Sequence, residues 1–410
     1  MTSLPDYDVV IAGGGMTGAS LAVALAGENI RIAIIEAVSP RSDDQPSYDD
    51  RGLALSLSSQ RVLQGLNLWE KVSATSCPVQ HVHVSDQHHF GFVRLHAEAM
   101  SIPALGYVVV ARELGRILLE KINSANNIDL ICPASIEDIV IQTDRAVINL
   151  KQGNEDKLIS GRLLVAADGS HSTVCRFLGI KASVKDYGQT AIVTNVTPAR
   201  KHLNTAWERF TPQGPLALLP LTDDRCAVVF TVSQDEVEAY MTMKDADFLD
   251  QLQCRFGRRL GKFHRLGKRK SYVMQLIISD EQVRERVVVL GNSAHTIHPN
   301  GAQGFNLCLR DVAGLAEILL PAFRSGIDLG KRRILNQYQD LRECDQKNVI
   351  QFTDGLTRLF YNDLLHKVLF RNIGMLLMDM MPSCKKTFMQ RAMGMHGHQP
   401  VLVRGTPVCP

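Results

Sequence analysis

The chain has 410 residues, which is long enough for two packed cores, and 45% apolar with 21% charged residues is typical of an ordinary folded protein. A formal net charge of +3 is too small to indicate a nucleic-acid partner, so we interpret the basic runs at 258–270 and 331–333 as solvated faces. No apolar stretch approaches the roughly 20 residues that span a bilayer, and no signal-peptide pattern precedes the first predicted strand. The nine cysteines show no CxxC spacing and predict reduced thiols in a cytoplasmic protein.

A glycine-rich turn near the N-terminus joins a predicted strand at 9–12 to a predicted helix at 19–26. Three glycines stand at the spacing G-x-G-x-x-G: Gly13, Gly15 and Gly18. Such a turn lets the backbone approach a pyrophosphate at a helix N-terminus, where unpaired N–H groups favour anions. A second predicted strand ends at Glu36, where a carboxylate can accept hydrogen bonds from ribose hydroxyls. The unit predicts dinucleotide binding, and the alternative is a glycine turn kept for packing.

Two further strand-turn-helix units follow. A predicted strand at 163–167 stops at Asp168 and Gly169, a position that lies at the ligand-binding edge of an open α/β sheet or forms a plain turn. A third strand at 287–290 precedes a loop with Gly301 and Gly304, and a helix is predicted from about residue 305. This second glycine loop at a helix N-terminus is another site for an electron-rich group.

In this order and separation, the three units resemble the flavin-dependent monooxygenases that include 4-hydroxybenzoate hydroxylase, over nearly the whole chain. Segments such as WERFTPQGPLALLPL from Trp207 and GNSAHTIHP from Gly291 resemble the ubiquinone-biosynthesis branch of that family, and most of all its 2-polyprenyl-6-methoxyphenol hydroxylases. The resemblance implies FAD as the cofactor and NAD(P)H as the electron donor. It also implies O2 and a polyprenylated phenol as substrates, with oxygen transfer through a flavin C4a-hydroperoxide.

The resemblance also implies which residues contact FAD. The first turn and the acid hold the ADP half, the Asp-Gly turn lies near FAD and the donor, and the third unit lies along the ribityl chain and flavin ring. Two arginines, one after the first unit and one at the start of a predicted helix, are further candidates, with surface ion pairs as the alternative. The implied cofactor-binding residues are Gly13, Gly15, Gly18, Glu36, Arg51, Arg112, Asp168, Gly169, Gly291, Asn292, Gln303, Gly304 and Asn306.

Three departures from the family pattern bear on cofactor and donor binding. Asn292 stands where most relatives carry Asp, which removes a negative charge beside the cofactor and predicts looser binding of FAD. Cys175 takes the place of an arginine that follows the Asp-Gly turn, and Arg176 comes next. The loop reads Gly-Ala-Gln-Gly from Gly301, where the ubiquinone branch usually reads Ala-Gly-Gln-Gly.

No side-chain nucleophile is required, because the cofactor carries the chemistry. His298, in the loop predicted to border the flavin, is the candidate catalytic residue, since it can orient or deprotonate a phenol. The alternative is a loop histidine that only hydrogen-bonds backbone. We predict no metal site, although His81, His83, His88 and His89 cluster in the sequence, because no thiolate or carboxylate set stands nearby at ligand spacing.

The fold class follows as α/β, with a doubly wound parallel sheet that binds FAD, a mainly antiparallel β substrate domain and a C-terminal helical region. We place the FAD-binding domain at 1–75, 105–180 and 268–330, and the substrate domain at 76–104 and 181–267. Helices are predicted at 331–395 and a mobile tail at 396–410. Basic residues beside the apolar rows of the helical region permit contact with the face of the inner membrane: Arg358, Lys367, Arg371, Lys385 and Lys386.

Two other functions stay open at this level. One is an FAD-binding accessory subunit of a quinone-synthesis complex without hydroxylase activity of its own, for which Asn292 and Cys175 are signs of decay. The other is a flavin reductase that acts on prenyl double bonds. A flavin disulfide reductase is excluded, because the chain has neither a second G-x-G-x-x-G nor a redox cysteine pair.

Overall fold

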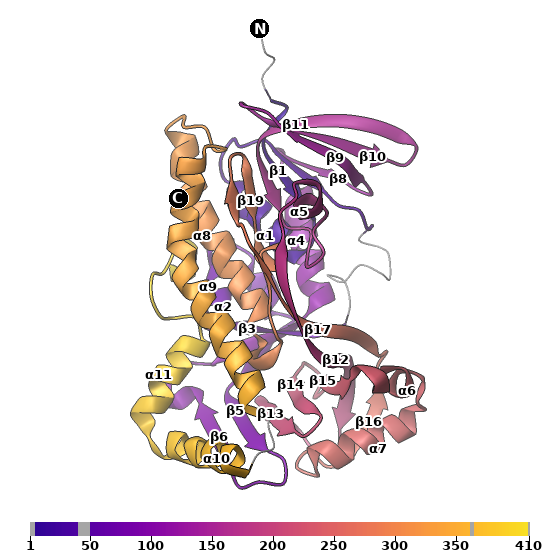
Figure 1. Ribbon diagram of the computed structural model, residues 1–410. Helices are drawn as coiled ribbons and strands as arrows, with labels where there is room; N and C mark the ends of the chain where they lie inside the picture. The colour runs from indigo at the N-terminus through magenta and orange to yellow at the C-terminus, as the bar shows by residue number, and fades with distance from the viewer. Residues whose placement is uncertain (1–4, 40–49, 361–364, 409–410) are drawn as a thin grey trace.

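The computed structural model describes residues 5–39, 50–360 and 365–408. Figure 1 shows an elongated molecule with one sheet in its upper half, a second sheet in its lower half and long helices along one side of both. Within the described residues no helix combines the length and the apolarity needed to cross a bilayer. The described cysteines are all free, as the spacing predicts.

The first sheet is the parallel sheet expected of the dinucleotide-binding unit. Its strand order is β18-β19-β11-β1-β2-β8, and β10 and β9 extend one side of it through β11. The central strands are nearly continuous apolar runs because both faces of the sheet are covered. The strands are β1 (Tyr7–Ala12), β2 (Ile32–Ile35), β8 (Ile128–Ile131), β9 (Ser135–Ile141), β10 (Ala146–Gln152), β11 (Glu155–Ala166), β18 (Val283–Arg284) and β19 (Val287–Val289).

Helices cover one face of this sheet, and the β9–β10 hairpin with α5 covers the other. The first helix begins at Met16, directly after the glycines, and therefore earlier than the expected start at residue 19. The helices of this unit are α1 (Met16–Leu25), α2 (Leu57–Gly65), α3 (Trp69–Ser73), α4 (Ala111–Asn123), α5 (Thr173–Phe177) and α8 (Gly304–Arg324). A small antiparallel sheet of β3 (Gly52–Ser56), β7 (Gly106–Val110) and β4 (Cys77–Val79) faces the second half of the molecule.

The second sheet has the order β20-β17-β12-β15-β14-β13-β5-β6, with β16 paired to β12. It is mainly antiparallel, as expected, but β13 and β5 run parallel. Its strands are β5 (His81–Asp86), β6 (Phe92–His96), β12 (Ala182–Pro198), β13 (Thr205–Thr211), β14 (Gly214–Pro220), β15 (Cys226–Ser233), β16 (Phe263–Leu266), β17 (Lys270–Ser279) and β20 (His295–Thr296). The expected boundary at 268 would assign β17 to the FAD-binding domain, although β17 belongs to the second sheet. The division of the chain into domains therefore stays a proposal.

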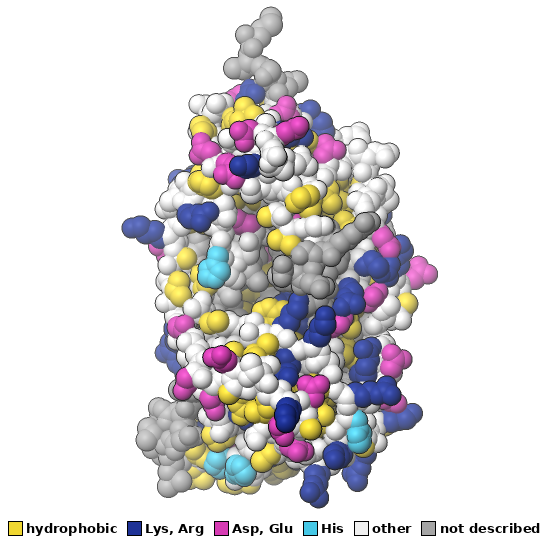
Figure 2. Space-filling model, turned by 90° about the vertical axis from the view of Figure 1, so that its right-hand side faces the viewer, with side chains coloured by type: hydrophobic (Ala, Val, Ile, Leu, Met, Phe, Trp, Pro, Cys, Tyr) yellow, Lys and Arg dark blue, Asp and Glu magenta, His cyan; other side chains and the backbone are white. Residues whose placement is uncertain are grey.

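The two faces of the second sheet have different neighbours. One face packs under α6 (Val237–Thr242) and α7 (Asp245–Phe256), with Phe230 and Phe248 at the centre of the apolar cluster. Beyond α7, the basic run at 258–270 is largely exposed, and Figure 2 shows Lys and Arg side chains mixed with acidic ones on this side of the molecule. This mixture agrees with a solvated face. The opposite face of the sheet points toward the parallel sheet and the helical region.

The C-terminal region is helical, as predicted, with α9 (Arg332–Phe360), α10 (Leu365–Met380) and α11 (Pro382–Ala392). We expected a mobile tail from residue 396, but residues Val401–Arg404 form a short 3-10 helix, η6, in contact with α2. Leu402 and Val403 are buried in the core of the first unit. Three apolar residues are too few to show a helical period in the sequence, although they are enough to pack. Cys409 and Pro410 lie outside the described residues.

Candidate cofactor and substrate site

The first turn has no room for side chains. Gly13 has a φ of +100°, and a Cβ there would lie 2.4 Å from the carbonyl oxygen of Ala167 at the end of β11. A Cβ on Gly18 would lie 2.0 Å from the carbonyl oxygen of Gly13, so this glycine lets α1 pack against the turn. Gly15 caps α1, and no side chain accepts a hydrogen bond from the first backbone N–H groups of the helix. Those donors are what a pyrophosphate requires.

Glu36 lies beside this turn, at the end of β2. One carboxylate oxygen accepts a hydrogen bond from the N–H of Gly14 (2.7 Å), and the other accepts from the N–H of Val38 (2.8 Å). These two bonds hold the partly exposed carboxylate in place. Each oxygen has a second lone pair, so Glu36 can still accept a hydrogen bond from a ribose hydroxyl.

The three turns meet at the carboxyl ends of β1, β11 and β19. Asp168 accepts hydrogen bonds from the N–H of Val174 (3.1 Å) and from the hydroxyl of Ser293 (3.1 Å), and the hydroxyl oxygen of Ser293 accepts from the N–H of Gly169 (3.0 Å). Gly291 has a φ of +61°, and a Cβ there would lie 2.7 Å from Cγ2 of Thr17 in the first turn. The convergence that the sequence predicts is therefore present.

Two glycines leave open space beside this junction. Gly169 and Gly301 have φ values of +89° and +67°, and a Cβ on either would have no atom within 4 Å. The tight glycines bring the turns together, while these two leave room beside them. Gly304 begins α8, where no side chain caps the backbone donors, which again suits an electron-rich group.

The two arginine candidates differ in their surroundings. Arg112 is exposed and forms an ion pair with Asp50 at 2.8 Å, which matches the surface alternative for this residue. The Arg51 guanidinium is partly buried, 5.3 Å from the ring centroid of Tyr272 in β17. Arg51 therefore lies between the two sheets, whereas Arg112 lies at the surface beside it.

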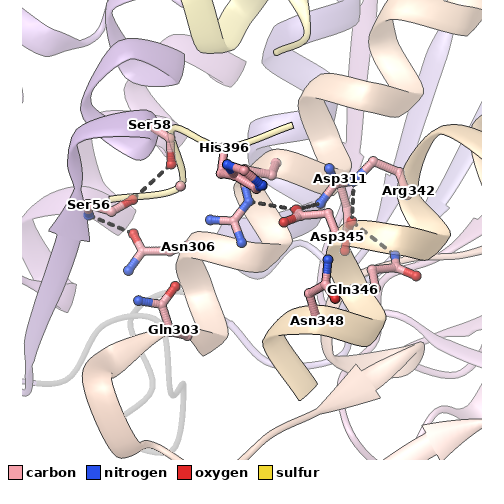
Figure 3. Close-up of polar contacts among 12 residues, drawn as sticks. Ser56, Ser58, Gln303, Asn306, Asp311, Arg342, Asp345, Gln346, Asn348 and His396 are labelled. Atoms are coloured by element: carbon pink, nitrogen blue, oxygen red, sulfur yellow. Dashed lines mark hydrogen bonds and ion pairs between the residues drawn. The ribbon is translucent and has the colours of Figure 1, made fainter. Parts of the chain in front are cut away.

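Asn306 and Gln303 are hydrogen-bonded to the protein itself, and Figure 3 shows the bond between Asn306 and Ser56. The amide oxygen of Asn306 accepts from the N–H of Ser56 (2.8 Å) and the hydroxyl of Ser59 (2.6 Å), and its NH2 group donates to two backbone carbonyls. All four positions of the amide are therefore used. The NH2 group of Gln303 donates to the carbonyl oxygens of Gly301 (3.2 Å) and Ala392 (3.1 Å). The expected flavin contacts of these side chains stay untested, and the geometry favours a positioning role.

A buried ionic network lies behind the third turn (Figure 3). Asp311 in α8 is 2.5 Å from Nε2 of His295 in β20, and it accepts from Arg342 (2.8 Å) and Gln346 (3.0 Å) in α9. Burial alone would raise the pKa of Asp311, but the charges of Arg342 and His295 outweigh it and hold the pKa at about 2. The network fixes β20, α8 and α9 together and so holds the loop at 297–303. The sequence analysis did not identify it.

Asn292 and Cys175, the departures from the family pattern, lie in different environments. The side chain of Asn292 is exposed beside the third turn, and its amide oxygen accepts a weak hydrogen bond from the thiol of Cys308 (3.6 Å). Asn292 is thus free to turn toward a ligand with little loss. Cys175 lies in α5, and burial raises the pKa of its thiol. Cys175 therefore does not supply the positive charge that an arginine would place there.

His298 is fully buried in the loop between β20 and α8. Its Nδ1 accepts a hydrogen bond from the N–H of Asn300 (3.2 Å), and its ring meets the edge of Tyr187 with centroids 4.9 Å apart. Burial lowers the pKa of His298 to about 4, so the ring is neutral near pH 7 and carries its proton on Nε2. Nε2 has no hydrogen-bond partner among the described residues. His298 can therefore donate a hydrogen bond, but it has no free nitrogen to accept a proton.

The four histidines clustered in the sequence do not meet as ligands. His81 pairs with His96, while His83 lies between Trp207 and the guanidinium of Arg259. In the part of the chain that the structure describes, no group of three or more His, Cys, Asp or Glu side chains has the arrangement to hold a metal ion.

A small, partly open cavity lies between the second sheet, the loop at 299–303 and α9. Phe210 and Phe360 stack in its wall with centroids 3.4 Å apart. Two buried amide oxygens, of Gln189 and Asn300, have no partner among the described residues. The wall of the cavity is therefore aromatic, and the two amide oxygens are unused hydrogen-bond acceptors. Its lining residues are Gln189, Phe210, Thr211, Gly214, Pro215, Asn300, Thr357 and Phe360.

The sequence profile of one family, described as an FAD binding domain, matches residues 6–353. The chain belongs to this FAD-binding family. Among its relatives, the ubiquinone hydroxylase UbiL of Rhodospirillum rubrum is 35% identical over 404 residues, which cover 98% of this chain and 93% of the relative. The 3-demethoxyubiquinol 3-hydroxylase of Escherichia coli is 28% identical over 96% of this chain and all of the relative.

Solved structures of other flavin monooxygenases have the same fold as this member of the family. The p-nitrophenol 4-monooxygenase PnpA of Pseudomonas putida superposes with a TM-score of 0.80 over 95% of this chain and 99% of its own, at 16% identity. PqsL of Pseudomonas aeruginosa, a probable FAD-dependent monooxygenase, has a TM-score of 0.74 at 21% identity over 90% of this chain and 99% of its own. The protein is a flavin-dependent hydroxylase whose cofactor is FAD, with the NAD(P)H donor that is typical of the family.

Proposed function

We propose that the protein hydroxylates the aromatic ring of a polyprenylated phenol in ubiquinone biosynthesis, with 2-polyprenyl-6-methoxyphenol as substrate and the 1,4-benzoquinol as product. The observation that carries the proposal is the cavity beside the third turn. Its stacked Phe210 and Phe360 offer an aromatic wall, and the oxygens of Gln189 and Asn300 beside it have no hydrogen-bond partner among the described residues. The hydroxylases UbiL and 3-demethoxyubiquinol 3-hydroxylase among its relatives support the pathway.

Different parts of the chain would bind the cofactor and the substrate. The first turn and Glu36 would hold the ADP half of FAD, and the Asp168 and Gly291 turns would border its ribityl chain and ring. Bound and reduced, FAD supplies the activation of O2 for ring hydroxylation. The protein holds the phenol at the cavity, where the apolar wall excludes water, and His298 helps to hold the loop because its Nδ1 accepts a hydrogen bond from the N–H of Asn300.

The direct test supplies purified protein, FAD and NADPH with a short-chain 2-prenyl-6-methoxyphenol under ¹⁸O2. The proposal predicts one ¹⁸O atom in a quinol product. Product without the label contradicts the oxygenase chemistry. Binding of FAD without any turnover favours the alternative that we keep, an FAD-binding accessory subunit of a quinone-synthesis complex.

We further propose that α10 contacts a membrane surface, where a polyprenyl substrate resides. Several apolar side chains of α10 and its end are exposed: Leu369, Phe370, Ile373, Leu377, Met380 and Met381. Lys386 and Arg391 on α11 are exposed nearby, whereas Asp379 is paired with Arg94 and Lys385. An apolar helix face rimmed by basic residues suits anionic lipid. The side chain of Lys367 lies outside the described residues, and that of Arg371 is buried against Asp86 instead of facing lipid.

Cosedimentation with vesicles of anionic lipid tests this contact. The double variant Phe370→Ser, Met380→Ser should lose most of the binding, because both side chains are about three-quarters exposed, at 74% and 76%. Leu203→Ser, which removes an equally exposed side chain (72%) from the connection between β12 and β13, is the matched control. Equal binding by all three proteins contradicts the proposal.

A further inference from the structure

Glu208 is a carboxylate on the inner face of the second sheet. Along β13 the side chains alternate, so Ala206, Glu208 and Phe210 share one face. Trp207 and Arg209 point the other way, toward α7: the ring of Trp207 contacts Phe256, and the guanidinium of Arg209 donates to the carbonyl oxygen of Arg255. Glu208 therefore faces the FAD-binding half of the molecule.

Apolar side chains surround Glu208 on that face. Its partners across the strands are Val84 in β5 and Ala217 in β14, and its neighbours along the strand are Ala206 and Phe210. Among the described residues no hydrogen bond or ion pair of the Glu208 carboxylate is present. Burial raises the pKa of Glu208 to about 7. A carboxylate in such surroundings costs stability, and buried groups of this kind are concentrated at functional sites.

The position of Glu208 places it at the edge of the candidate site. Ala206 packs with Val108 and Ala227 where the second sheet meets the small sheet, and Phe210 stacks on Phe360 where it meets α9. Glu208 lies between these two contacts, and its side chain stays partly accessible there. The next residue of this face, Phe210, lines the cavity. Glu208 thus lies two residues before Phe210, on the face of β13 that carries the aromatic wall of the cavity.

We propose that Glu208 is the catalytic base of the hydroxylation and accepts the proton of a phenol bound against this face of the sheet. The inference rests on the proposed function. In this step the phenol O–H bond breaks, an O–H bond forms on the carboxylate, and the electron pair stays on the phenolate oxygen, which activates the ring. After oxygen transfer the carboxyl group returns its proton to the same ring oxygen, as the hydroxylated carbon releases its hydrogen to water as a proton.

His298 cannot serve as this base, because Nδ1 is occupied and Nε2 already carries a proton. The other charged groups on the elements that pack around Glu208 have partners of their own. Asp86 is bound to Arg371 and Asn372, Asp354 to Lys185 and Tyr187, and Arg51 lies against Tyr272. Glu208 is therefore the carboxylate with free oxygens on this face.

The test compares two phenols on the FAD-loaded protein: 2-allyl-6-methoxyphenol, and a ring-fluorinated analogue whose hydroxyl is largely ionised at neutral pH. Glu208→Gln keeps the shape of the side chain but cannot accept a proton. We expect it to slow hydroxylation of the weakly acidic phenol at pH 7 by about 100-fold or more, the usual range for loss of a general base. The slowing should shrink toward unity with the ionised phenol. Glu208→Asp should lie between Glu208→Gln and the wild type.

The pH profile gives a second readout that a structural role would not move. In the wild type the rate should rise through about pH 7 as Glu208 ionises, and Glu208→Gln should lose this rise. Glu238→Gln, an exposed carboxylate on α6, is the matched control and should behave as the wild type. Equal slowing of both phenols, or no slowing of either, overturns the proposal for Glu208. A wild-type protein that hydroxylates neither phenol instead overturns the proposed function.

Discussion

Gly291 and Thr17 lie against each other, although one belongs to the third turn and the other to the first. A Cβ on Gly291 would lie 2.7 Å from Cγ2 of Thr17, so only glycine permits this approach. The contact, with the bonds of Asp168 to Ser293, makes one surface from three distant parts of the chain.

Gly13→Ala should reduce stability and FAD retention together. The new Cβ would lie 2.4 Å from the carbonyl oxygen of Ala167, and alanine at a φ of +100° is strained. Gly153→Ala in the β10–β11 turn is the control, since Gly153 also has a positive φ (+63°) but no atom near its Cβ. We expect the control to cost about 1–2 kcal/mol in the free energy of unfolding and to keep FAD. Similar losses in both variants would contradict the close-approach argument.

Asn306→Ala should destabilise the protein because it leaves buried partners without hydrogen bonds. Each buried group left unpaired costs about 1–3 kcal/mol, and Asn306 serves Ser56, Ser59 and two carbonyls. Chemical denaturation of the apoprotein measures this loss without any ligand. An unchanged free energy of unfolding, combined with weaker FAD binding, would show that the side chain serves the flavin instead.

Asn292→Asp should strengthen FAD binding, because a carboxylate accepts a stronger hydrogen bond from a ribityl hydroxyl than an amide does. A gain of about 1.4 kcal/mol corresponds to about tenfold in the dissociation constant. The side chain is exposed, so stability of the apoprotein should not change. Fluorescence titration with FAD measures the constant. A dissociation constant for FAD that is equal to or larger than that of the wild type would exclude this role for Asn292.

Asp311→Asn should be strongly destabilising at neutral pH, because it leaves the buried Arg342 with the Asp345 carboxylate alone and breaks a fully buried ion pair, a loss of up to about 3–5 kcal/mol. The folded pKa of Asp311 is about 2, below the unfolded value of about 3.9. Its ionised form therefore stabilises the fold above about pH 4, and this contribution is lost as the pH falls toward 2. The difference in unfolding free energy between wild type and variant should shrink over that interval. A difference that stays constant with pH would mean that the stability lost in the variant does not come from the charge of Asp311.

Much of the fold follows from local patterns in the sequence. The strands before the three turns are short apolar runs that end at glycine or Asp-Gly, and the structure has β1, β11 and β19 there. The alternation in Pro215–Pro220 and 225–232 predicts β14 and β15 for the same reason. The helical period after residue 330 predicts α9 to α11. These features depend on a few neighbouring residues, so the sequence carries them directly.

What the sequence did not indicate depends on contacts between distant residues. The pairing of Asp311 with His295 and Arg342 joins a strand and two helices, and each residue alone is an ordinary polar residue. Asn306 matches the family pattern of a flavin contact, but its partners Ser56 and Ser59 are known only from the fold. In the sequence, Glu208 is one residue of a predicted strand. Only the sheet register shows that it lies on the inner face of the second sheet. The tail was wrongly expected to be mobile, because burial of Leu402 depends on the surface of α2.

The most direct test of the account is FAD binding by the wild-type apoprotein beside Gly13→Ala and its control Gly153→Ala. Visible flavin absorbance of the protein after removal of free FAD, and the thermal midpoint with excess FAD, are measured on all three. We expect stoichiometric flavin and a raised midpoint for the wild type and Gly153→Ala, and neither for Gly13→Ala. A folded wild-type protein that stays colourless, with an unchanged midpoint, would contradict the convergence of the three turns on FAD.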